Sequence, residues 1–248
     1  MAKALTEVGE FFNAWAIYRK VLSNNYMHHR EIYQAITDLL AEQWESRPFK
    51  LLDLGCGDAS FLAPTLQGRS IQHYMGFDLS APALALAAEN IAPLDCKAEL
   101  INIDFMEGLA QTNQCFDIVF NSYALHHLTQ EEKAEFFRLA HSVLSENGLL
   151  LIIDVMREPD ETLSIYLDNY CQWLREEWLE FDEQDFTAII QHIRHSDMPE
   201  TVSGLSALAE AAGFHPATSL HYLTWHQAIS FSKKTELFKE IADSRVRK

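Results

Sequence analysis

The chain has 248 residues, 48% of them apolar, which is enough for one large domain with a substantial core, so we do not expect a disordered chain. Its 36 acidic and 19 basic residues give a formal net charge of -17, which disfavours nucleic acid and anionic lipid as partners because the chain repels phosphate. The four cysteines lack metal-binding spacing, and there is no secretory leader or apolar run of the roughly 18 residues that span a membrane, so we expect a cytoplasmic protein with reduced thiols.

Residues 1–46 are predicted to form a helical prefix. Apolar side chains recur there at three- and four-residue spacing, which is typical of one helix face: Val8, Phe11, Phe12, Trp15, Tyr18 and Leu22. Asn24 and Asn25 interrupt this pattern, and a second helical pattern runs from Ile32 to Trp44. We expect two helices in this segment.

From Lys50 the chain alternates between short apolar runs and helical segments. The predicted strands are 51–54, 74–77, 99–103, 117–121 and 149–154, each apolar enough to be buried on both faces of a parallel sheet. Ser80 is the expected N-cap of a helix over 81–90, and Thr129 with Glu132 forms a capping box for a helix that Asn147-Gly148 would close. This alternation predicts a doubly wound α/β sheet.

The alternation stops after Asp154. Residues 157–200 are predicted to be a helical insert. The segment from Glu158 to Asp185 contains ten acidic residues and one basic residue. Ser203 is the expected cap of a helix over 204–212, followed by two strands over 214–220 and 222–231. Their short connection favours an antiparallel hairpin at the edge of the sheet.

The most informative motif is Asp53-Leu54-Gly55-Cys56-Gly57, a strand end that runs into a glycine-rich turn. Glycine lets a ligand approach bare backbone there, so the turn predicts a nucleotide-type site. Asp78 follows the next strand, 25 residues further on (78 minus 53), where a carboxylate can accept hydrogen bonds from ribose. Asp53 itself would crowd a pyrophosphate but suits a ligand with an ammonium group.

A third acid, Asp104, ends the third predicted strand at the same edge of the sheet. It is expected to accept a hydrogen bond from an adenine amino group, with the ring held between Leu79 and Phe105. Together with the glycine turn and Asp78, this arrangement resembles the class I S-adenosylmethionine-dependent methyltransferases. The resemblance covers residues 49–155 and, more loosely, 203–231; Ala59 departs from it, since many members have a third glycine there.

The resemblance implies a mostly parallel, seven-stranded sheet with a C-terminal antiparallel hairpin and S-adenosylmethionine as the cofactor. The prefix, residues 1–46, and the insert, residues 157–200, lie outside the resemblance. We expect the prefix to form a lid and residues 47–248 to form the cofactor-binding domain, with the insert as a cap. Asn121 and Ser122 are expected to line the methionine end of the cofactor. Tyr18, Tyr26 or Arg30 would meet its carboxylate or the substrate; the alternative for Tyr18 is that it is core of a helix pair.

His126 is the expected catalytic residue, because it follows the fourth strand and histidine commonly accepts a proton near neutral pH. The alternative is that His126 and His127 only pack the loop. His192 and His195 lie three residues apart, but no third ligand is apparent, so we expect no metal site. Aromatic side chains of the insert, with its carboxylates, would favour a cationic or neutral polar acceptor, unless they only pack beneath a solvated helix.

The resemblance implies a methyltransferase, which we expect to act on a nitrogen or oxygen of a small metabolite. Three alternatives stay open: an enzyme similar to carboxy-S-adenosylmethionine synthase, a protein that binds S-adenosylmethionine without turnover, and a methyltransferase for transfer RNA or protein. The first would need cations around a dicarboxylate, and only three arginines stand near the insert: Arg157, Arg175 and Arg194. The oligomeric state is left open.

Overall fold

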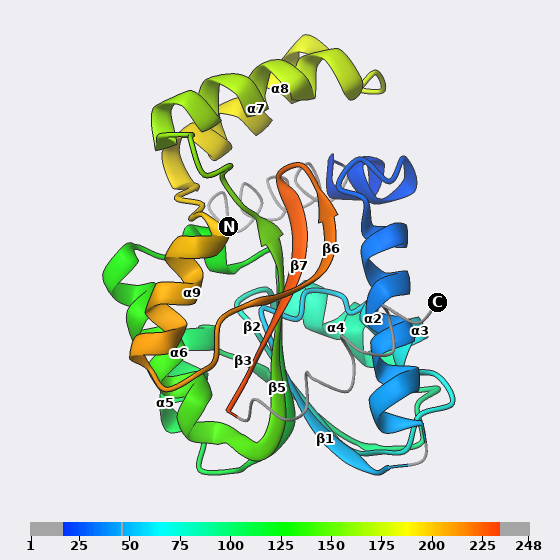
Figure 1. Cartoon of the computed structure of the whole chain (residues 1–248). Coiled ribbons are helices and arrows are strands. Elements are labelled where there is room, and N and C mark those ends of the chain that lie inside the picture. Colours follow the sequence, from blue (N-terminus) through cyan, green and yellow to red (C-terminus); the bar gives the residue numbers. More distant parts are fainter. Residues whose placement is uncertain (1–16, 46, 234–248) are drawn as a thin grey trace.

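A computed structural model describes residues 17–45 and 47–233. It shows one seven-stranded sheet in the order β3-β2-β1-β4-β5-β7-β6, with helices on both faces (Figure 1). Residues 17–23 are helical, and the elements that follow are α2 His29–Trp44, β1 Phe49–Leu54, α3 Leu62–Leu66, β2 Ile71–Asp78, α4 Ala81–Ile91, β3 Lys97–Asn102, α5 Phe105–Gln111, β4 Phe116–Ser122, η1 Leu125–His127, α6 Gln130–Val143, β5 Leu144–Val155, α7 Leu163–Glu177, α8 Glu183–Ser196, α9 Val202–Ala211, β6 Thr218–Leu223 and β7 His226–Ser232.

The sheet has the predicted topology. Strands β1 to β5 pair in parallel, β7 pairs antiparallel with β5, and β6 pairs antiparallel with β7 at the edge. Strand order reverses at β1, which lies between β2 and β4. Ligands of open α/β sheets bind outside the carboxyl ends of the strands at such a reversal, so this topology fixes where the site should lie.

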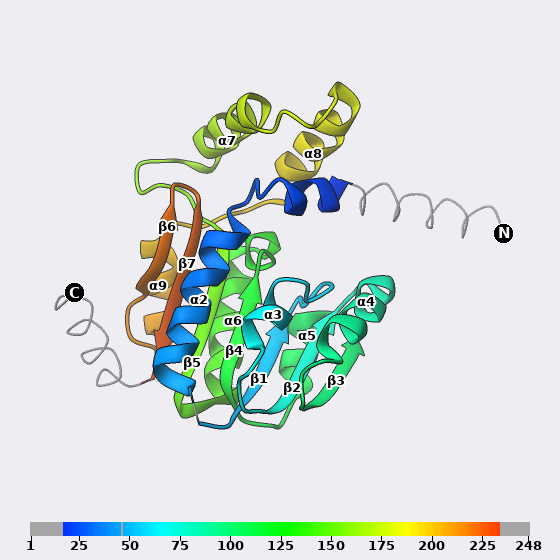
Figure 2. The same cartoon turned by 90° about the vertical axis from the view of Figure 1, so that its right-hand side faces the viewer.

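Three hydrophobic clusters hold the molecule together. One packs α2, α3 and α4 on one face of the sheet, and the second packs α6 and α9 on the other. The third joins α7 and α8 to residues 17–27 and includes Val21, Tyr166, Trp178 and Phe186. Figures 1 and 2 show α7 and α8 beyond the carboxyl ends of the parallel strands, so this pair of helices forms a cap over that edge, and the prefix packs against it.

Some predicted boundaries were wrong. Helix α6 ends at Val143, and β5 starts at Leu144, so Asn147-Gly148 lies inside a strand rather than closing a helix. Helix α9 begins two residues earlier than expected, because the Thr201 hydroxyl, not Ser203, accepts the hydrogen bond from the Gly204 N–H.

The final hairpin also starts later than predicted. Phe214 is not in a strand, because its N–H donates to the Ala209 carbonyl and, with Gly213 at a φ of 97°, completes the end of α9. Strand β6 therefore starts at Thr218. Within the prefix, the break at Asn25 is confirmed, whereas Val8, Phe11, Phe12 and Trp15 lie outside the described residues. None of the described helices is both long and apolar enough to cross a membrane.

Candidate functional site

A cavity of about 420 Å³ lies at the carboxyl ends of β1 and β4, where the strand order reverses. This volume is in the about 300–1,000 Å³ range of small-molecule pockets. The lining comes from the prefix and α2, the glycine turn, α3, α4 and the end of β4, and includes Tyr18, Met27, His29, Tyr33, Asp53, Gly55, Cys56, Gly57, Asp58, Ala59, Ser60, Phe61, Ser80, Phe120, Ser122 and Tyr123. The predicted glycine turn is therefore part of the cavity wall.

The glycine turn needs its glycines for conformation and for space. Gly55 has a φ of 73° and Gly57 a φ of 52°, which side chains rarely adopt. A Cβ on Gly55 would lie 3.0 Å from the Cβ of Ala124, whereas one on Gly57 would meet only open space. Ala59 also has a positive φ of 55°, so the position where many relatives have a third glycine does carry backbone strain here.

Asp53 lies on the cavity wall with only 2% of its surface exposed. The Tyr74 hydroxyl donates to its Oδ2 atom at 2.5 Å. Burial raises the pKa of Asp53 to about 7, with a smaller contribution from the negative charge of Asp78, although the Tyr74 hydrogen bond opposes the rise. A carboxylate that is hard to ionise is stabilised by a cation beside it, so this geometry fits an ammonium group.

Asp78 and Asp104 lie at the ends of β2 and β3, but their carboxylates already bind backbone. Asp78 accepts from the Gly57 and Ser80 N–H groups, each at 2.8 Å, and so holds the glycine turn. Asp104 caps α5 through the N–H groups of Met106 and Glu107. Asp78 accepts one hydrogen bond on each oxygen and Asp104 accepts both of its bonds on Oδ1, so both acids keep acceptor capacity for a ligand.

The other predicted cofactor contacts divide into two groups. Ser122 and Tyr18 line the cavity, and the Tyr33 hydroxyl donates to Ser122 at 3.0 Å. Leu79, Phe105, Asn121, Tyr26 and Arg30 are not part of its lining. Leu79 is 71% exposed beside it. Their roles toward a cofactor stay predictions.

Three of these residues have structural partners instead. Asn121 is fully buried and donates to the Leu54 carbonyl, which ties β4 to β1. Tyr26 stacks on Trp178 with ring centroids 5.1 Å apart and joins the prefix to the cap. Arg30 donates to the Ser23 carbonyl at 3.0 Å and closes the loop between the two prefix helices.

His126 lies outside the cavity lining. Its Nδ1 atom hydrogen-bonds to Asp154 Oδ1, and its backbone N–H donates to Asp154 Oδ2 at 2.8 Å. Burial would lower its pKa, but the charge and hydrogen bond of Asp154, together with Asp197, raise the pKa overall. The ring is thus held in place by an ion pair, and its catalytic role stays a prediction.

Sequence reasoning did not assign a role to His29, Tyr33 or Tyr123, although all three line the cavity. Burial, with a smaller effect of His28, lowers the pKa of His29 to about 4, and its Nδ1 atom has no hydrogen-bond partner among the described residues. Tyr123 has a φ of 53°, and such strain in an aromatic residue is typical of functional sites. In the sequence, the four-residue spacing of His29 and Tyr33 places both on one face of α2, and this spacing was the signal that could have indicated them as site residues.

Comparisons with known proteins agree with this geometry. Residues 51–148 match the family model of a methyltransferase domain. An uncharacterized methyltransferase of Oceanobacillus iheyensis is 23% identical over 189 residues, covering 75% of this chain and 85% of that protein. A carboxy-S-adenosyl-L-methionine synthase of Campylobacter hominis is 24% identical over 164 residues, covering 64% of this chain and 68% of that protein.

Solved structures share the fold at low identity. The S-adenosylmethionine-dependent methyltransferase SibL in its apo form has a TM-score of 0.55 and 19% identity over 79% of this chain. Human N-acetylserotonin methyltransferase in complex with S-adenosylmethionine has a TM-score of 0.57 and 15% identity over 84% of this chain. This chain spans 53% and 52% of the lengths of those two solved chains. Residues 51–148 thus resemble a methyltransferase domain, and the chain shares the fold of solved S-adenosylmethionine-dependent methyltransferases.

Proposed function

We propose that this protein transfers a methyl group from S-adenosylmethionine to a nitrogen or oxygen atom of a small, neutral or cationic polar metabolite. The glycine turn and Asp53 would hold the cofactor, since they offer bare backbone and an acid suited to its ammonium group. A bound sulfonium methyl is already an activated electrophile, so the protein mainly has to align the acceptor atom at about 3–3.5 Å and exclude water.

The charge of the cavity wall is the observation that carries this proposal. Its described lining contains the carboxylates of Asp53 and Asp58 but no lysine or arginine. Aromatic rings of Tyr33, Phe61 and Tyr123 supply much of the remaining wall. Carboxylates and aromatic faces attract ammonium groups and tolerate neutral polar groups, whereas an anionic acceptor would meet repulsion.

His29 is the proposed positioning residue for the acceptor. A pKa of about 4 keeps its ring neutral at physiological pH, so the unpartnered Nδ1 atom can accept a hydrogen bond from a hydroxyl or amine. Such a weak base orients the donor group without removing its proton before transfer. The prefix and the cap would exclude water from the site, since both lie over this edge of the sheet (Figure 2).

The similarity to carboxy-S-adenosylmethionine synthases supports a second candidate, modification of S-adenosylmethionine itself. That reaction would need a cation for a dicarboxylate, and the described cavity wall offers none. Mass spectrometry of the ligand that copurifies with the protein separates the two. A carboxylated cofactor would overturn methyl transfer, whereas S-adenosylmethionine or its demethylated product would support it.

The direct test uses S-adenosylmethionine with a labelled methyl group and a metabolite extract. We expect one small compound to gain the label. His29→Phe should then slow transfer to that compound by about tenfold or more, the loss expected for one hydrogen bond, while calorimetry shows unchanged affinity for S-adenosylmethionine. His195→Gln, an exposed position on α8, is the matched control. Failure of every small compound to gain label would contradict the proposal, and it would leave a binding protein or a macromolecular acceptor.

A further inference from the structure

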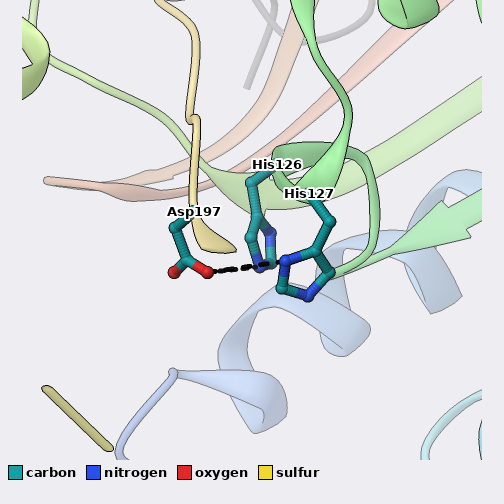
Figure 3. Close-up of side chains that lie close together, drawn as sticks. All are labelled: His126, His127 and Asp197. Atoms are coloured by element: carbon teal, nitrogen blue, oxygen red, sulfur yellow. Dashed lines mark ion pairs between the residues drawn. The ribbon is translucent and has the colours of Figure 1, made fainter. Parts of the chain in front are cut away.

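Two histidines and an aspartate from separate segments meet beneath the cap. His126 and His127 belong to η1, and Asp197 follows α8 (Figure 3). One potential ligand atom of each lies within 4.8 Å of the other two. The Asp197 Oδ1 atom is 3.8 Å from His126 Nε2 and 3.5 Å from His127 Nδ1.

These separations suit a small four-coordinate cation. A zinc ion with ligands at about 2.0–2.1 Å places neighbouring tetrahedral ligand atoms about 3.3 Å apart. The two distances to Asp197 exceed that value by only a few tenths of an ångström, and the histidine ligand atoms lie within 4.8 Å of each other. Side-chain rotations would close the shell, with His127 Nδ1 giving up its 3.4 Å contact with the Ser196 carbonyl. His192 Nε2, at 3.9 Å from Asp197 Oδ1, is a nearby side chain for the fourth position.

His126 is oriented as metal-binding histidines usually are. Its Nδ1 atom bonds to Asp154, whose side chain is 2% exposed, so the Nε2 atom is the one that faces Asp197. A carboxylate behind a ligating histidine fixes the ring and its tautomer and makes the other nitrogen a better ligand. The contact between Nδ1 and Asp154 can stay in place while Nε2 binds a metal.

Asp197 supplies an independent observation. Its side chain is 6% exposed, and Oδ1 has no hydrogen-bond partner within the described part of the chain. A buried carboxylate is costly unless it is paired or coordinates a metal. The nearby histidine nitrogens are those of His127 at 3.5 Å, His126 at 3.8 Å and His192 at 3.9 Å, and none of them makes a hydrogen bond to this oxygen.

The backbone around the cluster is fixed in advance. The Met198 N–H donates to the His126 carbonyl at 2.7 Å, which holds the end of α8 against η1. The buried Lys133 ammonium donates to the carbonyls of Leu128 and Met198, both at 2.6 Å, and strengthens the same junction. The three side chains are therefore presented by a rigid junction between cap and sheet.

We propose that His126, His127 and Asp197 bind a zinc ion that fastens the cap to the sheet core. Imidazole nitrogen with one carboxylate oxygen favours zinc and its neighbours among the transition metals over calcium or magnesium, which take mainly oxygen ligands. The site would complete its shell with His192 or water. It is separate from the cavity, whose lining contains none of these four residues.

Cobalt titration tests the site, because four-coordinate Co²⁺ has a characteristic visible absorption and binds where zinc does. The full chain, without a histidine tag, is stripped with a chelator and titrated with Co²⁺. We expect one equivalent to bind with the spectrum of nitrogen and oxygen ligands, and Zn²⁺ to displace it. Asp197→Asn and His127→Gln should each weaken binding by at least about tenfold, since even outer-shell partners contribute on that scale.

His195→Gln is the matched control and should bind Co²⁺ as the unmodified protein does. The proposal is overturned if the unmodified protein takes up no Co²⁺ or if a thiolate band shows that cysteines bind it. It is also overturned if both variants bind with unchanged affinity. Circular dichroism checks that each variant folds. If Asp197→Asn does not fold, the test depends on His127→Gln, because the His127 side chain is 40% exposed and its replacement disturbs little packing.

Discussion

Buried histidines of this protein have pKa values shifted in opposite directions, depending on whether a carboxylate lies beside the ring. Burial lowers the pKa of His226 to about 3, with smaller effects of His28, His29 and His126. In contrast, the carboxylates of Asp154 and Asp197 overcome burial at His126 and raise its pKa. A ring with no anion beside it therefore stays neutral, and a ring between two acids favours the proton.

The neutral state of His226 predicts a pH-dependent stability. Its pKa is about 6.5 in the unfolded chain and about 3 in the folded protein, so only the unfolded chain binds a proton here as the pH falls through that window. The free energy of unfolding should then fall by about 1.4 kcal/mol per pH unit from this site. Above about pH 6.5 both states are neutral and the site contributes no slope.

His226→Gln isolates this effect, because glutamine does not titrate and keeps an acceptor for the Tyr170 hydroxyl, which lies 3.0 Å from His226 Nε2. Urea unfolding between about pH 7 and pH 5 should show a shallower loss of stability in the variant than in the unmodified protein. The difference between the two proteins is the readout, because the raised pKa of Asp53 acts in the opposite direction in both. Equal slopes would contradict the assignment.

Asp78→Ala should weaken S-adenosylmethionine binding by at least about 1 kcal/mol, through lost hydrogen bonds to ribose and loss of the contact that holds Gly57. Titration calorimetry measures this affinity. Asp95→Ala, at an exposed position before β3, should bind normally. Unchanged affinity in Asp78→Ala would remove Asp78 from the site.

Among the elements, helices begin where side chains replace missing backbone partners. Thr129 and Glu132 form a reciprocal capping box at the start of α6, and Thr162, Asp182 and Thr201 cap α7, α8 and α9. The last three caps fix where the two helices of the insert and the helix that follows it begin. Local hydrogen bonds therefore explain where the cap helices start, although they do not explain how those helices pack.

Thr129→Ala should lower the free energy of unfolding by about 1 kcal/mol, because it leaves the Glu132 N–H without its partner. Chemical denaturation measures the change. Thr129→Ser keeps the hydroxyl and should lose much less. If alanine and serine at this position gave equal stability, the capping box would not contribute to α6.

For the whole molecule, the main features are the cap over the carboxyl edge and the large negative charge. The formal net charge of the chain is -17, which opposes the compact state through self-repulsion. The cap nevertheless packs closely, because its buried aromatic side chains form the third hydrophobic cluster with the prefix.

Screening should therefore stabilise this protein. Raising NaCl from about 0.01 M to about 1 M shortens the Debye length from about 30 Å to about 3 Å, and the Tm should rise. Differential scanning calorimetry measures it, and KCl serves as a control because the effect depends on ionic strength and not on the cation. A Tm that falls with salt would show that attractive ion pairs outweigh repulsion.

The sequence alone determined the order of strands and helices and the glycine turn, because periodicity and turn chemistry are local properties. It also identified Asp53, Gly55, Cys56, Gly57 and Ser122, which line the cavity, since strand ends in a parallel sheet share one edge. Only the tertiary structure decided that His29, Tyr33 and Tyr123 complete the wall and that Asp197 meets His126 and His127. Those contacts depend on how the prefix and the insert pack over the sheet, and packing between distant segments leaves no fixed spacing in the chain.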